Sequence, residues 1–183
     1  GLGHAVLCGE PCLNDSHFGL ILPDDVILSE KPVLGQLAEV HSERGGSVLA
    51  LEEVSWEETS RYGIVEGLEL GNGLFRITDL VEKPLPGEAP GRLAIIGRYL
   101  LSGSIFRHLR SAGAGVNGEI QLTDALKGLL AEEPVFGLLY KGERLDCGTK
   151  VDWLRATVKM PLRDPELKEF VLDIVRKEGC LGR

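Results

Sequence analysis

Four charged residues have the types and positions that phosphate and hydroxyl recognition require. Asp24 follows the apolar run 18–22, Glu82-Lys83 closes a later apolar segment, and Asp146 lies in a turn ahead of a predicted helix. Mg²⁺ in proteins typically takes one or two carboxylates and completes its coordination with water and phosphate oxygens. A lysine ammonium suits a phosphate as a point charge, and a glutamate accepts two hydrogen bonds from vicinal hydroxyls. These residues therefore fit a site for a divalent cation and a hydroxyl-bearing phosphate.

Each of these residues also has a purely structural explanation. Asp24 and Asp25 could cap the turn that follows the apolar run, and Asp146 could start the next helix. Glu82 and Lys83 could be the polar end of an ordinary strand. The residues alone leave these explanations open for Asp24 and Asp146, with Asp25 as a secondary candidate for the cation.

The order Glu82-Lys83-Pro84 bears on how the two charged side chains are arranged. Neighbouring residues on a strand point to opposite faces. A proline ends the strand and breaks that simple alternation. Two glycines in predicted strands could also matter. Gly63 would let another group approach the backbone closely, or would mark a strand bulge, and Gly97 has a similar claim.

The composition is that of a globular chain and disfavours two classes of partner. The 183 residues are 43% hydrophobic and 26% charged, with a net charge of −8. This charge disfavours nucleic acid and anionic membranes as partners, whereas local lysines or a bound metal would still admit a small anion. No apolar run reaches the roughly 18 residues of a membrane span, and no signal-peptide pattern is found. We therefore expect a cytoplasmic protein.

The four cysteines give no metal-binding pattern. Cys8, Cys12, Cys147 and Cys180 lack the paired spacing of a zinc knuckle. Cys8 and Cys12 could pair with each other, but free thiols fit a cytoplasmic protein better.

The apolar segments alternate between strand-like and helix-like patterns, which predicts an α/β sandwich. We expect Phe18–Leu22 to be a buried parallel strand. Further strands are predicted at 47–54, 62–65, 74–81, 93–101 and 135–140, with a turn at Gly71–Gly73 between the third and fourth of the six. Helices are predicted at 32–43, around 105–109, at 118–132 and at 149–159, with a loop at 113–115.

A terminal amphipathic helix is predicted within 162–183. Its apolar residues recur at i, i+3, i+4, i+7 and i+8, and they are Leu167, Phe170, Val171, Ile174 and Val175. This stripe could pack on the chain's own core or form a subunit contact in a homo-oligomer. No repeat or linker interrupts the chain, so residues 1–183 are predicted to be one domain.

Taken together and in this order, three motifs resemble parts of the sugar-1-phosphate nucleotidyltransferases. Leu22-Pro23-Asp24-Asp25 and Leu145-Asp146-Cys147-Gly148 are similar to the metal-binding parts of that group, and Val81-Glu82-Lys83-Pro84 to the sugar-binding part. The resemblance is greatest to the bacterial UTP–glucose-1-phosphate uridylyltransferase family. It implies a three-layer α/β sandwich with a mostly parallel mixed sheet, the Rossmann-like nucleotide-diphospho-sugar transferase fold.

Two further segments carry the same resemblance. Gly1-Leu2-Gly3-His4 is similar to the family segment that lies against the uracil ring, and Gly118-Glu119-Ile120-Gln121-Leu122-Thr123-Asp124 also matches. Asn117 stands where the related thymidylyltransferases have an arginine, which favours the uridylyltransferase branch. His4 is expected to be a helix-start or packing residue, because a sugar phosphate is already ionised near neutral pH and needs no general base.

The resemblance implies a reaction and a role for each candidate. UTP and glucose 1-phosphate would give UDP-glucose and pyrophosphate by in-line attack of a glucose 1-phosphate oxygen on the α-phosphate of UTP. Mg²⁺ would be held by Asp24 and Asp146, with Lys83 on the phosphate and Glu82 on the glucose hydroxyls. The backbones at Gly63 and Gly97 would approach the sugar, and Gly3 would contact the base.

The family's N-terminal phosphate loop, a glycine-rich run followed by Thr-Arg and a later Pro-Lys, is not found in residues 1–183. We therefore expect these residues to be the sugar- and metal-binding part of the domain, to have an unpaired sheet edge, and to be inactive alone. Two other functions stay open: a related enzyme acting on dTTP or another sugar 1-phosphate, and a non-catalytic fragment that binds a sugar nucleotide.

Overall fold

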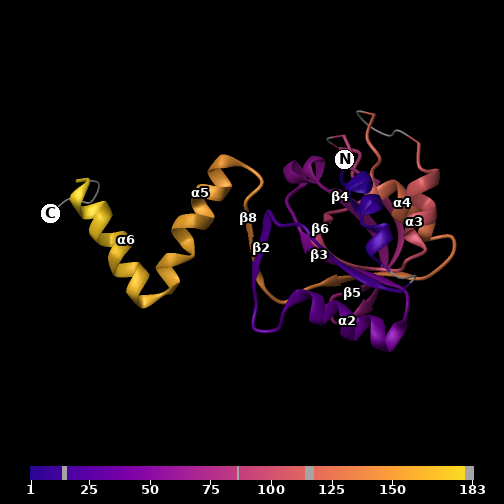
Figure 1. The fold of residues 1–183 in the computed structure, drawn as a ribbon, viewed down its shortest axis with the longest axis horizontal. Helices are drawn as coiled ribbons and strands as arrows, with labels where there is room; N and C mark the ends of the chain where they lie inside the picture. The colour runs from indigo at the N-terminus through magenta and orange to yellow at the C-terminus, as the bar shows by residue number, and fades with distance from the viewer. Residues whose placement is uncertain (14–15, 86, 114–117, 180–183) are drawn as a thin grey trace. The chain divides into compact units, whose positions relative to one another are not determined.

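The computed structural model describes residues 1–13, 16–85, 87–113 and 118–179. They form two compact units, one of residues 1–22 and 29–142 and the other of residues 23–28 and 143–183 (Figure 1). The single domain expected from the sequence stays a prediction. Cys180, Asn117 and most of the loop predicted at 113–115 lie outside the described residues.

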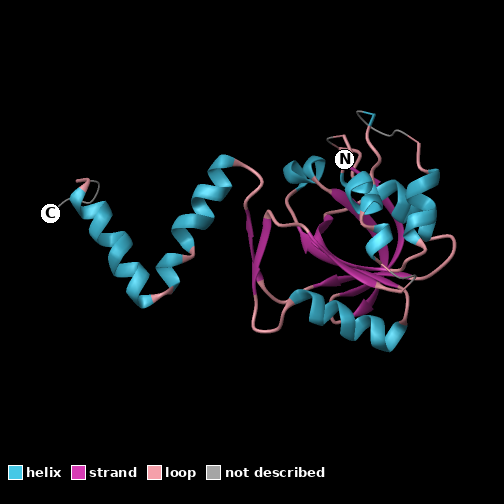
Figure 2. Cartoon of the chain, in the orientation of Figure 1, coloured by secondary structure: helices cyan, strands magenta, loops and turns pink. Residues whose placement is uncertain are grey.

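The first unit alternates helices and strands as the apolar patterns predict (Figure 2). In chain order its elements are α1 Leu2–Cys8, β1 Phe18–Ile21, α2 Val33–Arg44, β3 Ser47–Glu53, β4 Gly63–Gly71, β5 Leu74–Glu82, β6 Leu93–Leu101, α3 Ile105–Ser111, α4 Leu122–Leu129 and β7 Val135–Leu139, with 3-10 turns at Glu10–Cys12 and Trp56–Arg61. Most predicted elements are confirmed within two residues, and β6 is confirmed at both ends.

Three predicted elements differ from the structure. The strand expected at 62–65 continues as β4 to Gly71. The helix expected at 118–132 runs only from Leu122 to Leu129, because Gln121 before it is extended, with a ψ of 134°, and Gly118 has a φ of 74°. The strand at Phe18 is half-buried and antiparallel to its partner β6, rather than buried and parallel. A short apolar run fits a strand in either direction, so its pattern could not decide this.

The sheet is mixed, as expected, but it is not mostly parallel. Its strand order is β1-β6-β3-β7-β5-β4, and β4 also pairs with β6. Among the pairings of described strands only β3–β7 is parallel. The hairpin β4–β5 is one reason, since a tight turn can join only antiparallel strands. All three residues of its turn, Gly71, Asn72 and Gly73, have positive φ.

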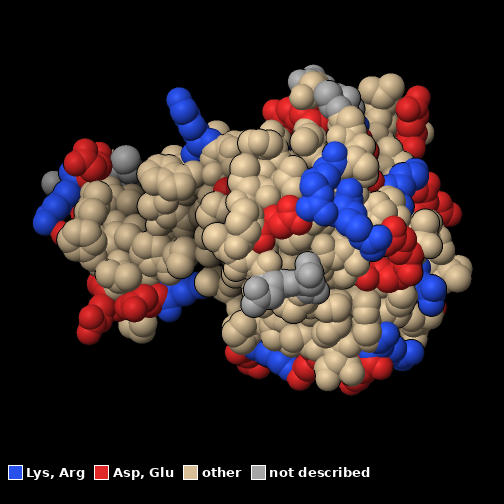
Figure 3. All heavy atoms as spheres, turned by 45° about the vertical axis from the view of Figure 1, so that its right-hand side comes forward, with Lys and Arg blue, Asp and Glu red and all other residues tan. Residues whose placement is uncertain are grey.

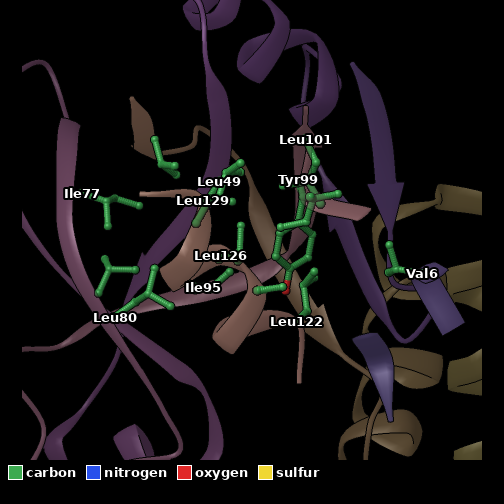
Figure 4. Packing of buried hydrophobic residues seen from close by; sticks show 14 of the residues in the cluster. Val6, Leu49, Ile77, Leu80, Ile95, Tyr99, Leu101, Leu122, Leu126 and Leu129 are labelled. Atoms are coloured by element: carbon green, nitrogen blue, oxygen red, sulfur yellow. The ribbon is translucent and has the colours of Figure 1, made fainter. Parts of the chain in front are cut away.

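Helices cover both faces of this sheet in three layers. Leu49 and Leu51 of β3 face the cluster formed with α3 and α4, and the alternate residues Val48 and Ala50 point to the other face. There α2 packs on β3 and β6 and buries Leu37, while α4 lies across the sheet from it (Figure 1). Figure 4 shows the cluster, in which α4 contributes its leucines. This packing fixes the start of α4 near the end of β5.

The second unit is built from two short strands and two helices. Its elements are β2 Asp25–Leu28, β8 Glu143–Asp146, α5 Lys150–Lys159, a 3-10 turn Pro161–Arg163 and α6 Pro165–Lys177. Thr149 caps α5 by accepting a hydrogen bond from the Asp152 N–H at 3.1 Å. β2 and β8 pair antiparallel, and the sequence pattern did not predict either strand.

The apolar stripe of α6 is not covered by its own unit. Leu167, Phe170 and Ile174 are 50%, 64% and 45% exposed, and none of the helix's residues is buried. The sequence left two explanations open for this stripe, and packing on a core within the second unit is not found. None of the described helices has the length and apolar character needed to cross a membrane.

Candidate active site

The carboxylate of Glu82 is the centre of a close group at the end of β5. Its side chain is 17% exposed, and its Oε2 accepts a hydrogen bond from the Thr123 hydroxyl at 2.5 Å. Thr123 is in the first turn of α4 and is buried. β4 supplies the third member, since Gly63 is the register partner of Glu82. Strand pairing and the packing of α4 on β5 thus bring three distant segments together.

Lys83 adds a cation beside this carboxylate. Its φ of 43° lies in the left-handed region, and its N–H donates to the carbonyl of Tyr62 at 3.0 Å. The side chain therefore does not continue the alternation of β5, and its Nζ lies 3.8 Å from Glu82 Oε1. The expectation that Pro84 breaks the alternation agrees with this geometry. The lysine side chain is 59% exposed, so the cation is open to an anion from solvent.

Gly63 leaves room that any other residue would fill. A Cβ built there would lie 3.2 Å from both Glu82 Oε2 and Thr123 Oγ1, and 3.3 Å from Ile95 Cδ1. The β4–β5 register is regular at Gly63 and shifts only further along, between Glu66 and Gly67 and near the turn. The bulge alternative is therefore wrong at this position, and close approach to the carboxylate is the reason for glycine here.

Gly3 packs α1 against the segment that leads into α4. Its N–H donates to the carbonyl of Ile120 at 3.0 Å, and a Cβ at Gly3 would lie 2.6 Å from that oxygen. The contact of Gly3 with a base stays a prediction. His4 is exposed on α1 with Cys8 Sγ 3.9 Å from its ring nitrogens, which agrees with a structural role.

Gly97 lies within β6 beside β1. Its carbonyl accepts from the N–H of Leu22 at 2.9 Å and from the guanidinium of Arg98 at 2.8 Å. Any strand residue could accept these bonds, so the close approach of another group to this glycine stays a prediction. Its approach to a sugar stays a prediction.

Asp24 and Asp146 belong to the second unit, where the structure brings them together. β2 and β8 pair Asp25 with Asp146, and the Cys147 N–H donates to the carbonyl of Asp24 at 2.7 Å. A Cβ built at Gly148 would lie 3.1 Å from Asp146 Oδ1 and 3.7 Å from Asp24 Oδ2. Oxygens from two segments more than a hundred residues apart thus face one point that is kept open by a glycine.

A neighbouring arginine contacts both Asp146 and Asp25. Arg144 forms an ion pair with the buried carboxylate of Asp25, and its other arm donates to Asp146 Oδ2 at 3.2 Å. Asp25 therefore points toward Arg144, in agreement with its secondary standing. The Gly148 N–H donates to Asp146 Oδ1 at 2.8 Å.

The donor set fits a hard cation that keeps other ligands. Within the described part of the chain no group of three or more His, Cys, Asp or Glu residues could hold a metal ion. Two carboxylate oxygens around an open point match the one or two carboxylates that Mg²⁺ takes when phosphates supply the rest. A zinc site would need about four nitrogen or sulfur ligands.

Two residues of this arrangement were not singled out from the sequence. Thr123 lies within the matching segment 118–124, but the motif does not say which member meets Glu82. Arg144 had no signal at all, because its role depends on pairing across β2 and β8. Both are found only when the strands and helices are placed.

Comparisons with known proteins all indicate the same family. The profile described as nucleotidyl transferase matches residues 1–161. The UTP–glucose-1-phosphate uridylyltransferase YngB of Bacillus subtilis is 40% identical over 97% of this chain, and a second one from the same bacterium is 37% identical over all of it.

Solved structures agree with this. A UDP-glucose pyrophosphorylase complexed with UDP-glucose superposes with a TM-score of 0.82 at 41% identity, covering 85% of this chain and 60% of that one. A UTP-bound enzyme of the same kind from Acinetobacter baumannii gives 0.83 at 31% identity, covering 96% and 61%. A thymidylyltransferase structure at 22% identity and a TM-score of 0.67 shows the shared fold alone.

The chain spans 61% and 62% of the length of the two Bacillus relatives. The family profile nevertheless covers most of its residues. The chain therefore belongs to the nucleotidyltransferase family, and the resemblance to UTP–glucose-1-phosphate uridylyltransferases is confirmed.

Proposed function

We propose that this protein makes UDP-glucose and pyrophosphate from UTP and glucose 1-phosphate. The observation that carries the proposal is the Glu82–Lys83 pair at the end of β5, which sets a hydrogen-bond acceptor and an exposed cation 3.8 Å apart. A sugar phosphate carries hydroxyls next to a phosphate, which match the acceptor and the neighbouring cation. The relatives that the chain resembles are uridylyltransferases, and one related structure contains UDP-glucose.

The residues of the first unit fit the binding and charge requirements of this reaction. An oxygen of glucose 1-phosphate attacks the α-phosphorus of UTP, and the bond from that phosphorus to pyrophosphate breaks. The barrier is largely one of repulsion between two anions, so fixed positive charge lowers it. Lys83 provides such a charge beside the sugar phosphate, while Glu82 accepts hydrogen bonds from the glucose hydroxyls.

Mg²⁺ is the metal that we propose for this protein, because it would neutralise and orient phosphate oxygens. Asp24 and Asp146 would hold it through the oxygens that face the open point at Gly148. Arg144 keeps Asp146 in place, as outer partners of metal ligands commonly do.

The surface charge supports small anions rather than nucleic acid or membranes as partners. The net charge is −8, and the basic group on the face in Figure 3 is flanked by acidic side chains. We infer a cytoplasmic enzyme, since its substrates are intracellular nucleotide metabolites.

We further propose that two copies of this chain associate through α6. A 13-residue helix with no buried residue gains little stability by itself, so its apolar stripe calls for a partner. The helix carries Glu166 in its first turn and Arg176 and Lys177 in its last. Antiparallel pairing of two copies would bury the stripe and set the acidic turn of each against the basic turn of the other.

Calorimetry with UDP-glucose, dTDP-glucose and Mg²⁺ tests the proposed activity. We expect tighter binding of UDP-glucose and strong weakening in K83A. K127A is the matched control, because Lys127 is similarly exposed at 55% and pairs with Asp79 at 2.7 Å. Preference for dTDP-glucose would assign the enzyme to the thymidylyl branch. Equal weakening by both variants would remove Lys83 from the site.

A further inference from the structure

The carboxylate of Glu82 is held from one side by a single buried hydroxyl. Thr123 Oγ1 donates to Oε2 at 2.5 Å, and Thr123 is 8% exposed. The other oxygen, Oε1, faces Lys83 Nζ at 3.8 Å. A mostly buried carboxylate is costly unless it receives hydrogen bonds, so the threonine hydroxyl both stabilises the charge and fixes the plane of the carboxylate.

Gly63 keeps this contact intact. A Cβ there would lie 3.2 Å from both oxygens of the hydrogen bond, closer than ordinary van der Waals contact, so the bonded pair would have to shift. The glycine therefore lets the pair keep its present position beside β4. The Thr123 hydroxyl donates its one hydrogen bond to Glu82 and can still accept hydrogen bonds from other groups.

We propose that Thr123 is a positioning residue for the sugar. This inference rests on the proposed function. Thr123 turns Glu82 so that Oε1, and the free lone pairs of Oε2, accept from hydroxyls of the hexose, while Lys83 beside them takes the phosphate. Its effect is on the sugar part of the ligand and not on the nucleotide, because its described bond is to Glu82.

The experiment compares UDP-glucose with UDP, which lacks the sugar, on wild type, T123V and T123S. T123V keeps the branched shape and removes the hydroxyl, and T123S keeps the hydroxyl. We expect T123V to weaken UDP-glucose binding by roughly tenfold or more, the usual range for a hydrogen bond to a charged group. UDP binding should be unchanged in T123V, and T123S should bind both ligands nearly as wild type does.

Kinetics supply a second readout on the same proteins. The KM for glucose 1-phosphate should rise in T123V, with the KM for UTP unchanged. T78V is the control, because Thr78 is exposed on β5. Should T123V fail to fold, T123A removes the hydroxyl without adding bulk and carries the same expectation.

Three outcomes distinguish a failure of this inference from a failure of the proposed function. Equal loss of UDP and UDP-glucose in T123V would show a merely structural residue and overturn the inference. Wild-type binding of UDP-glucose by T123V would overturn it as well. Wild-type protein that does not distinguish UDP-glucose from UDP would instead contradict the proposed function itself, before any variant is considered.

Discussion

The Nζ of Lys83 lies 3.8 Å from Oε1 of Glu82, although the two residues are neighbours at the end of one strand. Strand geometry would separate their side chains to opposite faces. The φ of 43° at Lys83 turns the chain, so that the Lys83 ammonium and the Glu82 carboxylate lie close together. Strained backbone of this kind is held in place by its surroundings, and it clusters at functional sites.

Removing the Lys83 cation should lower turnover as well as ligand binding. In steady-state assays of the full protein we expect K83A to lower kcat by roughly a hundredfold or more, as loss of a preorganised positive group does in other transfer reactions. K127A should stay near wild type, since its ion pair with Asp79 is an exposed one. Near-normal activity of K83A would exclude Lys83 from the chemistry.

The left-handed backbone at Lys83 should be measurable as stability. We expect K83G to exceed K83A in free energy of unfolding by about 0.5–1 kcal/mol, because glycine adopts positive φ without a Cβ clash. The order should reverse at Lys127 inside α4, where alanine favours the helix over glycine by about 1 kcal/mol. Urea denaturation measures both pairs, and K83A at or above K83G would argue against strain at this residue.

The two aspartates should govern the metal requirement. D24N and D146N should each raise the Mg²⁺ concentration needed for half-maximal UDP-glucose binding, by roughly tenfold or more. D173N is the control, since Asp173 is paired with Lys177 on α6 at 2.7 Å. The readout is calorimetric binding across a Mg²⁺ titration. Unaltered midpoints in both site variants would rule out this pair as the metal ligands.

Stability should decline as the pH falls below neutrality, in part through His17. Burial lowers the pKa of His17 below its usual 6.5, the neighbouring His41 lowers it further, and Glu133 opposes the shift. The folded state then resists protonation, so the contribution is complete above pH 6.5 and is lost as the pH falls through the lowered value. The ring is largely exposed, so the change is small.

The measurement is the difference in Tm between about pH 7.5 and pH 5.5, above and below the usual histidine pKa. The Tm of the wild type should fall by more than the Tm of H17Q over this interval, because glutamine does not titrate. Parallel curves for the two proteins would mean that charging His17 costs the fold nothing.

Charge reversal should test the association of α6. E166K or K177E alone should weaken self-association in sedimentation, because each places like charges opposite one another in an antiparallel pair. The double variant should restore it, since Glu166 and Lys177 exchange roles across the two-fold axis. A variant in the apolar stripe of α6 provides a second test, because F170S should favour the monomer. Monomeric wild type at every concentration, or a double variant no better than the single ones, would contradict the proposed pairing.

The sequence alone predicted the main elements of the first unit, because each has a pattern that local chemistry imposes. Apolar runs located β3 and β6, helical spacing located α2, and two glycines around Asn72 predicted the hairpin turn. Local pattern does not encode strand direction, however. The antiparallel pairing of β1 with β6 was therefore missed, as were β2 and β8, whose four residues each are too few to show a period.

The motifs likewise singled out Asp24, Glu82, Lys83 and Asp146 as candidates, because their residue types suit phosphate and sugar binding. Only the tertiary structure showed that Thr123 holds Glu82 and that Arg144 pairs with Asp25 across β2 and β8. Such contacts join segments separated by tens to more than a hundred residues. They depend on strand register and on helix packing across a sheet, which no local stretch of sequence determines by itself.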